Sequence, residues 1–335
     1  LYSLIFVLLI GLTVFTICSQ SASFTQEGFW EYVRAAHPAG LAAAALCTLL
    51  YILLEGLALL AICRALGYRR SVGQGVLYSA ADIYFSAITP SATGGQPASA
   101  VLMMRSGIPA APTAVALLIN LVLYTLSILL MAAAGLALHP GLLKLFGPAS
   151  RILIWVGAGT QVALLAGLTL LIFHEPIFLR LADWALKIGH KLHLIRDIES
   201  RKQKYAELRD DYQQCSGALR GQWKLILLSF VFNLAQRLAI VLSPVCVYLA
   251  EGGNRARTGE AFAAQTMVIL GSNAVPLPGS VGVADYLFLD GYRSLAQSPV
   301  LLELLSRAIS FYSCVVLCGA LLLVYAAKRK LSKER

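Results

Sequence analysis

The chain has 335 residues, of which 58% are apolar and only 13% are charged, and its formal net charge is +10. Soluble domains carry about 25% charged residues, so this composition excludes an ordinary water-soluble fold. The apolar residues form continuous runs rather than alternating with polar ones, which excludes an outer-membrane barrel. We therefore expect an all-α, polytopic membrane protein.

Six apolar runs are long enough to cross a bilayer, which takes about 20 residues. No basic segment precedes the first run, so we expect a transmembrane helix there rather than a signal peptide. The six predicted spans cover residues 1–18, 39–63, 109–137, 150–173, 222–249 and 298–327.

Two further apolar stretches, 74–104 and 259–292, are each interrupted by Gly and Pro. The first break reads TPSATGGQP over 89–97, and the second reads PLPGSVGVAD over 276–285. An unpaired backbone group in hydrocarbon costs several kcal/mol, so such breaks should be buried in protein or line a polar cavity. Each stretch is predicted to form a re-entrant hairpin of two half-helices, and the alternative is a Pro/Gly kink in an ordinary span.

Most of the 27 basic residues fall in segments that lie on one side if the C-terminus is cytoplasmic. The positive-inside rule then places both termini in the cytoplasm. With this topology the second half is the first half turned over, which predicts inverted repeats, A (1–145) and B (146–335). A substrate site between the two hairpin tips, near the middle of the membrane, is typical of this arrangement.

The segment 174–221 joins the two predicted repeats and carries many charges. Its first part has apolar residues at helical spacing between basic ones, which predicts a helix lying on the anionic cytoplasmic leaflet. Attraction to this membrane surface explains the net positive charge without a nucleic-acid partner.

Charged residues inside a membrane cost at least about 2.5 kcal/mol each, so each is a candidate for function. Glu55 and Arg237 lie at equivalent depths of the spans 39–63 and 222–249. They form either a structural ion pair or a binding site in which Arg237 attracts a phosphate and Glu55 a cationic group. Glu303 and Arg307 are four residues apart, and we expect them to form a structural pair.

The breaks add backbone chemistry, because Gly allows close approach of a ligand and the N-terminus of a half-helix favours an anion. The candidate substrate-binding residues are Glu55, Asp82, Gly94, Gly95, Gln96, Arg105, Gln236, Arg237, Pro278, Gly279, Ser280 and Asp285. We expect no catalytic residues, metal or cofactor, since no cluster of nucleophile and base, no metal-ligand spacing and no nucleotide loop is present.

The two break motifs resemble the transmembrane region of lysylphosphatidylglycerol synthases, also called the flippase domain of the multiple peptide resistance factor. The resemblance covers nearly the whole chain and implies a bacterial cytoplasmic-membrane protein that moves aminoacylated phosphatidylglycerol to the outer leaflet. This transport protects the cell from cationic antimicrobial peptides. Full-length relatives also carry a synthase domain, but only eight residues follow Ala327, so we expect no enzyme activity here.

The expected function is therefore lipid flipping, with a phospholipid and the anionic membrane surface as partners. A separate synthase is a further expected partner, and small residues at 42–45 and 132–135 would allow a homodimer. The alternatives are a secondary transporter of a soluble anion, the transmembrane part of a phosphatidylglycerol lysyltransferase, and a membrane-embedded enzyme of lipid metabolism.

Overall fold

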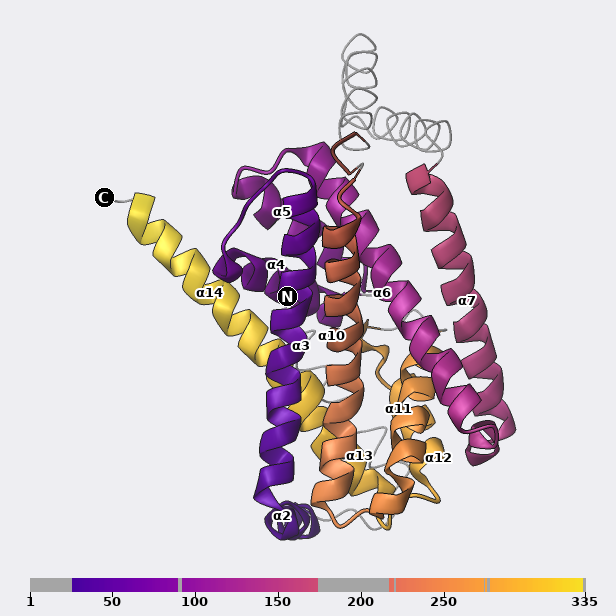
Figure 1. Ribbon diagram of the computed structural model, residues 1–335. Coiled ribbons are helices and arrows are strands. Elements are labelled where there is room, and N and C mark those ends of the chain that lie inside the picture. Colours follow the sequence, from indigo (N-terminus) through magenta and orange to yellow (C-terminus); the bar gives the residue numbers. More distant parts are fainter. Residues whose placement is uncertain are drawn as a thin grey trace, which may run out of the picture.

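The computed structural model describes residues 26–89, 92–173, 217–219, 221–273, 275 and 278–333, and all the regular structure in these ranges is helical (Figure 1). Five helical segments are long and apolar enough to cross a membrane. They correspond to five of the six predicted spans, and the first predicted span, 1–18, lies outside the described residues. The five segments are Pro38–Ala65, Ala110–Leu138, Pro148–Leu171, Trp223–Ala250 and Pro299–Arg329.

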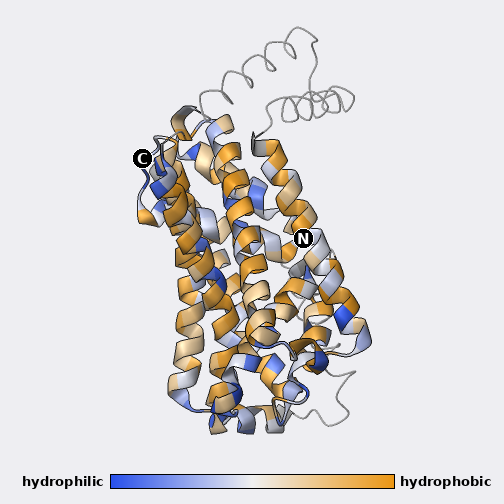
Figure 2. Ribbon diagram, turned by 45° about the vertical axis from the view of Figure 1, so that its right-hand side comes forward, coloured by the Kyte–Doolittle hydropathy of each residue, from blue (hydrophilic) through white to orange (hydrophobic). Residues whose placement is uncertain are grey.

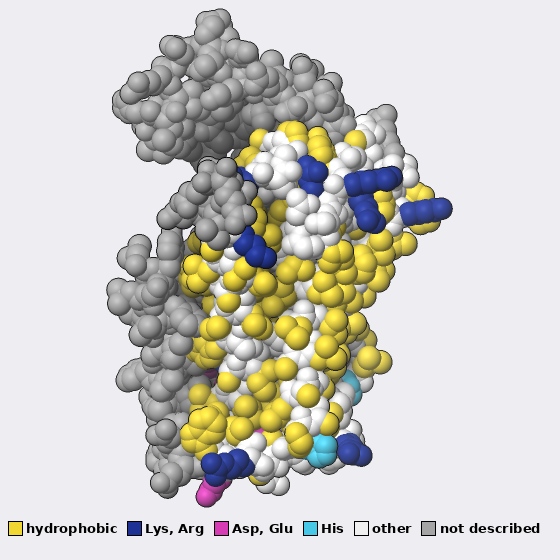
Figure 3. Space-filling model, turned by 90° about the vertical axis from the view of Figure 1, so that its left-hand side faces the viewer, with side chains coloured by type: hydrophobic (Ala, Val, Ile, Leu, Met, Phe, Trp, Pro, Cys, Tyr) yellow, Lys and Arg dark blue, Asp and Glu magenta, His cyan; other side chains and the backbone are white. Residues whose placement is uncertain are grey.

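The spanning helices are α3 (Pro38–Ala65), α6 (Ala110–Leu138), α7 (Pro148–Phe173) and α10 (Trp223–Ala250), followed by the last span, which contains α13 and α14. Figure 2 shows that hydrophobic residues dominate these helices along their length. Figure 3 shows the same pattern on one face, where hydrophobic side chains cover the middle and Lys and Arg side chains gather toward the two ends. This distribution is typical of membrane proteins, in which apolar side chains face the hydrocarbon and basic side chains lie near its edges.

Helices α3 and α10 pack against each other along much of their length and form the centre of the bundle (Figure 1). Two buried hydroxyl groups on α10 fix their register: Ser229 Oγ donates to the carbonyl of Ala58 at 3.0 Å, and Ser243 Oγ donates to the carbonyl of Ala44 at 3.1 Å. Such interhelical hydrogen bonds stabilise helix contacts in lipid, where the hydrophobic effect contributes little.

Each of the two broken stretches forms a pair of helices that are too short to cross the membrane. The first pair is α4 (Val72–Ile88) and α5 (Gly95–Arg105), and the second is α11 (Thr258–Ser272) and α12 (Val283–Tyr292). The pairs lie toward opposite ends of the bundle, α4–α5 in the upper part of Figure 1 and α11–α12 in the lower part. The division of the chain into repeats stays a prediction.

Each break contains a non-glycine residue with a left-handed backbone. The φ angle is 53° at Ala92 and 52° at Ser280. The second break also contains the short 3₁₀ helix η4 (Pro278–Ser280), with Gly279 at φ 59°. A left-handed conformation costs about 1–2 kcal/mol for a residue with a Cβ atom, and such strain persists where the surrounding structure holds it in place.

The last span differs from the uninterrupted helix that the sequence predicts. It consists of α13 (Pro299–Arg307), a π-helical turn η5 (Ala308–Tyr312) and α14 (Ser313–Lys333). A π turn is rare and is frequently found at functional sites. The remaining elements are α2 (Gln26–Ala35), η2 (Leu142–Leu145) and η3 (Arg255–Arg257). The predicted membrane-surface helix in 174–221 falls almost entirely outside the described residues.

Candidate binding cavity

A cavity of about 780 Å³ lies inside the bundle and is lined by both short-helix pairs and by all five spans. Six of the twelve candidate residues from the sequence line it. These six are Glu55, Asp82, Gln96, Arg237, Gly279 and Ser280. Its walls are mainly apolar, with charged side chains at two places. Concave, mostly apolar sites with a few converging polar groups are typical of small-molecule binding.

The first charged group joins α3, α4 and α10. Glu55 and Asp82 are 6% and 9% exposed, and their carboxyl groups lie within hydrogen-bonding reach of each other. Gln236 Nε2 donates to Glu55 Oε2 at 3.1 Å, and Gln96 Nε2 donates to Asp82 Oδ2 at 3.2 Å. Two amide side chains thus hold a pair of carboxyl groups at the cavity wall.

Arg237 belongs to the same group, but it does not meet Glu55 directly. Among the described side chains, no ion pair within 4.0 Å joins Arg237 to a carboxylate. Its Nε donates to Gln236 Oε1 at 3.1 Å, so Gln236 bridges it to Glu55. Helices α3 and α10 do meet, yet the direct ion pair considered from the sequence is replaced by this bridge.

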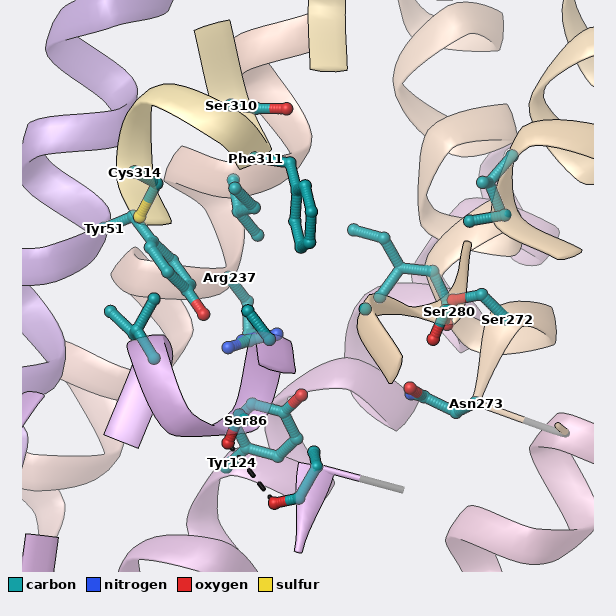
Figure 4. Close-up of a pocket in the computed structure, with 18 of the residues that line it drawn as sticks. Tyr51, Ser86, Tyr124, Arg237, Ser272, Asn273, Ser280, Ser310, Phe311 and Cys314 are labelled. Carbon is teal, nitrogen blue, oxygen red and sulfur yellow. Dashed lines mark hydrogen bonds between the residues drawn. The ribbon is translucent and has the colours of Figure 1, made fainter. Parts of the chain in front are cut away.

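Two aromatic rings hold the Arg237 guanidinium in place. Its Cζ atom lies 3.9 Å from the ring centroid of Tyr124 and 5.5 Å from that of Tyr51. Figure 4 shows the guanidinium between these rings, with Ser272 and Ser280 across the open space. Stacking over an aromatic face stabilises a desolvated cation and leaves its edge available for a planar anionic partner.

The second charged group joins α12 and α13. Arg307 pairs with Asp285 and also with Glu303, whose Oε1 is 3.1 Å from Arg307 Nε. Glu303 and Arg307 form the expected pair, but they also line the cavity, which the sequence did not indicate. All three side chains are buried, with exposed fractions of 0% for Asp285, 3% for Glu303 and 7% for Arg307.

The N-terminus of α12 differs from the expected anion site. Asp285 Oδ2 accepts the backbone N–H of Gly282 at 2.8 Å, so a carboxylate of this chain already occupies that position. Asp285 is the third residue of α12, and its hydrogen bond back to the N-cap residue Gly282 is one half of a capping box.

The first break is held together by its own side chains. Thr89 Oγ1 accepts the backbone N–H of Gly94 at 2.9 Å. A Cβ atom on Gly95 would overlap Ser86 and Asp82, so only glycine fits where α5 begins beside α4. Gly94 and Gly95 therefore shape the wall of the cavity rather than line it.

The other candidates have different positions. Gln236 is 1% exposed and acts behind the wall through its contacts with Glu55 and Arg237. Arg105 is exposed in the last turn of α5 and does not line the cavity. Pro278 begins η4, and its side chain lies outside the described part of the structure.

Several cavity residues were not singled out from the sequence as binding residues. Tyr51 precedes Glu55 by one helical turn on α3, and this i,i+4 spacing was a usable signal. The position of Tyr124 over Arg237 depends on the packing of α6 against α10, which no local pattern reveals.

Helix α7 contributes side chains to the cavity wall. Thr160 and Leu164 line it, and both side chains are exposed. Thr160 lies in the middle of Pro148–Phe173, so this part of the wall is at membrane depth if α7 spans the bilayer.

Comparison with known families identifies the chain. The family described as the lysylphosphatidylglycerol synthase TM region matches residues 1–318, and the chain belongs to this family. Comparison with curated proteins and with solved structures gives no match.

Proposed function

We propose, from this family membership and from the cavity, that the protein is a lipid flippase that moves aminoacylated phosphatidylglycerol, or a similar phospholipid, from the inner to the outer leaflet. The observation that carries the proposal is a cavity whose wall has both charge signs and also includes exposed side chains from the middle of α7. A soluble anion needs a water-facing entrance, whereas a lipid headgroup needs a lateral one. Its acyl chains would remain in the bilayer while the headgroup enters.

The charges suggest how a headgroup would be held. Arg237 would receive the phosphate, because its guanidinium has no carboxylate within 4.0 Å among the described residues and faces the cavity. The carboxyl groups of Glu55 and Asp82 would receive an ammonium group. Charge-assisted hydrogen bonds of these kinds contribute about 1.5–3 kcal/mol each.

The overall charge of the two groups favours a cationic headgroup. Four carboxyl groups and two guanidinium groups lie at or directly behind the cavity wall. Even with one proton shared by Glu55 and Asp82, three carboxylates and two guanidinium groups remain, so the net charge at the cavity wall is negative. Lysyl-phosphatidylglycerol, with two ammonium groups and one phosphate, complements this charge, and plain phosphatidylglycerol does not.

Transport would require the cavity to open alternately to the two leaflets. We attribute this to the short-helix pairs α4–α5 and α11–α12, acting as re-entrant hairpins of inverted repeats on opposite sides of the cavity. In this arrangement the protein lies in the bacterial cytoplasmic membrane with cytoplasmic termini, moves lipid without catalysing a reaction, and contributes to resistance against cationic peptides.

The test is lipid translocation in proteoliposomes, measured with fluorescent lysyl-phosphatidylglycerol and fluorescent phosphatidylglycerol. Wild type should translocate the lysyl lipid faster. Glu55→Gln and Arg237→Ala should each slow it about 10- to 100-fold, as expected for losing one charge-assisted contact. Glu260→Gln is the matched control, because Glu260 pairs with Arg257 on a partly exposed surface away from the cavity. Folded wild-type protein that translocates neither lipid would refute the proposal.

A further inference from the structure

The contact between Glu55 and Asp82 has a consequence for ion binding. The two carboxyl groups are buried and within hydrogen-bonding reach of each other. Two carboxylates this close in a buried site do not both ionise, because like charges repel strongly when they are removed from water. A proton held between them converts the repulsion into a hydrogen bond, and the pair then titrates as one unit.

The charged and titratable groups around Glu55 and Asp82 do not neutralise the second carboxylate in place of this proton. Arg237 on α10 is the neighbouring cation, but Gln236 and two tyrosine rings hold its guanidinium away from direct ion pairing. The other titratable groups near the pair are tyrosine hydroxyls and cysteine thiols. They are Tyr51 on α3, Tyr124 on α6, and Cys314 and Cys318 on α14.

Two further polar side chains of the cavity wall also indicate a polar ligand. Gln265 and Ser306 line it and are 8% and 2% exposed. Gln265 Oε1 and Ser306 Oγ have no hydrogen-bond partner among the described residues. Buried polar atoms are nearly always paired, so these two indicate a partner that enters the cavity. A ligand with its own polar groups is therefore expected in this cavity.

We propose that the Glu55–Asp82 pair is a proton-binding site at which one proton and one ammonium group of the lipid exclude each other, so that the protein exchanges lipid for a proton. The inference rests on the proposed function. With the proton bound, the pair carries one negative charge, which Arg237 balances. When the proton leaves, a second negative charge appears, and an ammonium group takes the place of the proton.

The exchange has a defined charge balance. A lysyl lipid carries one net positive charge toward the outer leaflet, and one proton returns. No net charge crosses the membrane in this cycle. The driving force is therefore the pH difference and not the membrane potential, and lipid accumulates in the leaflet that faces the more acidic compartment.

The first experiment imposes a pH difference across proteoliposomes that contain fluorescent lysyl-phosphatidylglycerol and measures its distribution between leaflets at steady state. For a one-to-one exchange, one pH unit should maintain about a tenfold leaflet ratio, since one pH unit is a factor of ten in proton activity. A potassium diffusion potential should maintain none. Translocation that is unaffected by the pH difference would overturn the exchange while leaving the flippase function intact.

The second experiment measures proton release on binding and does not require transport. Short-chain lysyl-phosphatidylglycerol is titrated into the full chain in nanodiscs, by calorimetry in two buffers of different ionisation enthalpy. Wild type and Glu260→Gln should release close to one proton per lipid, and Asp82→Asn should release close to none. Glu55→Gln is the second variant if Asp82→Asn does not fold.

Binding without proton release in the wild type would overturn the inference. If the lipid does not bind, infrared spectroscopy of the same nanodiscs tests the inference instead. It detects a protonated carboxylic acid by its C=O stretch. The inference requires a signal at neutral pH that is lost in Glu55→Gln and retained in Glu260→Gln. A spectrum in which Glu55→Gln changes nothing would contradict it, and absence of lipid binding together with absence of translocation would refute the proposed function separately.

Discussion

Replacing Gly56 by alanine tests how closely α3 and α4 must pack to hold the carboxyl pair. A Cβ atom at this position would lie 2.6 Å from the carbonyl carbon of Gly75, 2.7 Å from its oxygen and 2.9 Å from the nitrogen of Val76. Non-bonded carbon atoms normally lie about 3.5–4.0 Å apart, so α4 must move by about 1 Å. All three atoms belong to the backbone, so no side-chain rotation relieves the overlap.

The overlap determines the loss of stability that we expect for Gly56→Ala. Overpacking of a close-packed interior typically costs about 1–3 kcal/mol, and we expect Gly56→Ala to lower the stability of the protein by this amount. Asp82 lies two turns after Gly75 on the same side of α4, whereas Glu55 is next to Gly56 on α3, so the movement also separates the two carboxyl groups. Lipid translocation should therefore fall as well.

The assay is thermal unfolding in detergent, together with translocation in proteoliposomes. Gly73→Ala is the matched control: it is in the same helix as Gly75, and a Cβ atom there meets nothing within 4 Å. Alanine is favoured over glycine in a helix by about 0.5–1 kcal/mol, so this variant should be as stable as wild type or slightly more stable. Equal unfolding midpoints for Gly56→Ala and Gly73→Ala would refute the reasoning about the α3–α4 contact.

Three further predictions concern single residues. Arg307→Met should destabilise the protein by about 3–5 kcal/mol in denaturant unfolding, because it leaves two buried carboxylates without their cation; an unchanged midpoint would contradict this. Gly279→Ala should lower the unfolding midpoint, since φ is 59° and its Cβ atom would lie 2.6 Å from the ring of Phe311; Phe311→Leu should restore only part of the loss. Burial raises the pKa of Glu251, just beyond α10, from 4.5 to about 7. Glu251 then binds its proton more tightly in the folded state, so wild type should lose stability relative to Glu251→Gln as the pH rises from about 4.5 to about 7. If the unfolding stabilities of wild type and Glu251→Gln change with pH in parallel, the prediction is wrong.

The spans and the breaks were readable from the sequence because each depends on local composition. Runs of about 20 apolar residues predicted five helices that the structure contains, such as α6, with ends that differ by one or two residues. The breaks at 89–97 and 276–285 were readable because Gly and Pro interrupt helices wherever they occur together. The π turn before Ser313 was not readable, since no residue in Ala308–Tyr312 forces it.

The composition of the candidate site was only partly readable. The cost of burying charge made Glu55, Asp82 and Arg237 candidates, and all three line one cavity. The spacing of Glu303 and Arg307 explained them locally, so their place on the same cavity wall was missed. Arg105 was a candidate because it closes the first predicted hairpin, but it lies exposed at the end of α5 and does not line the cavity.

The sequence by itself determined that the chain is a helical membrane protein of this family, because hydropathy and the break motifs are properties of short segments. Only the tertiary structure decided which charges meet. Glu55 contacts Asp82 and reaches Arg237 through Gln236, and these contacts depend on how α3 packs against α4 and α10. Helix packing is set by the shapes of whole faces and by hydrogen bonds such as that from Ser229 to Ala58, between residues that are 171 positions apart in the chain.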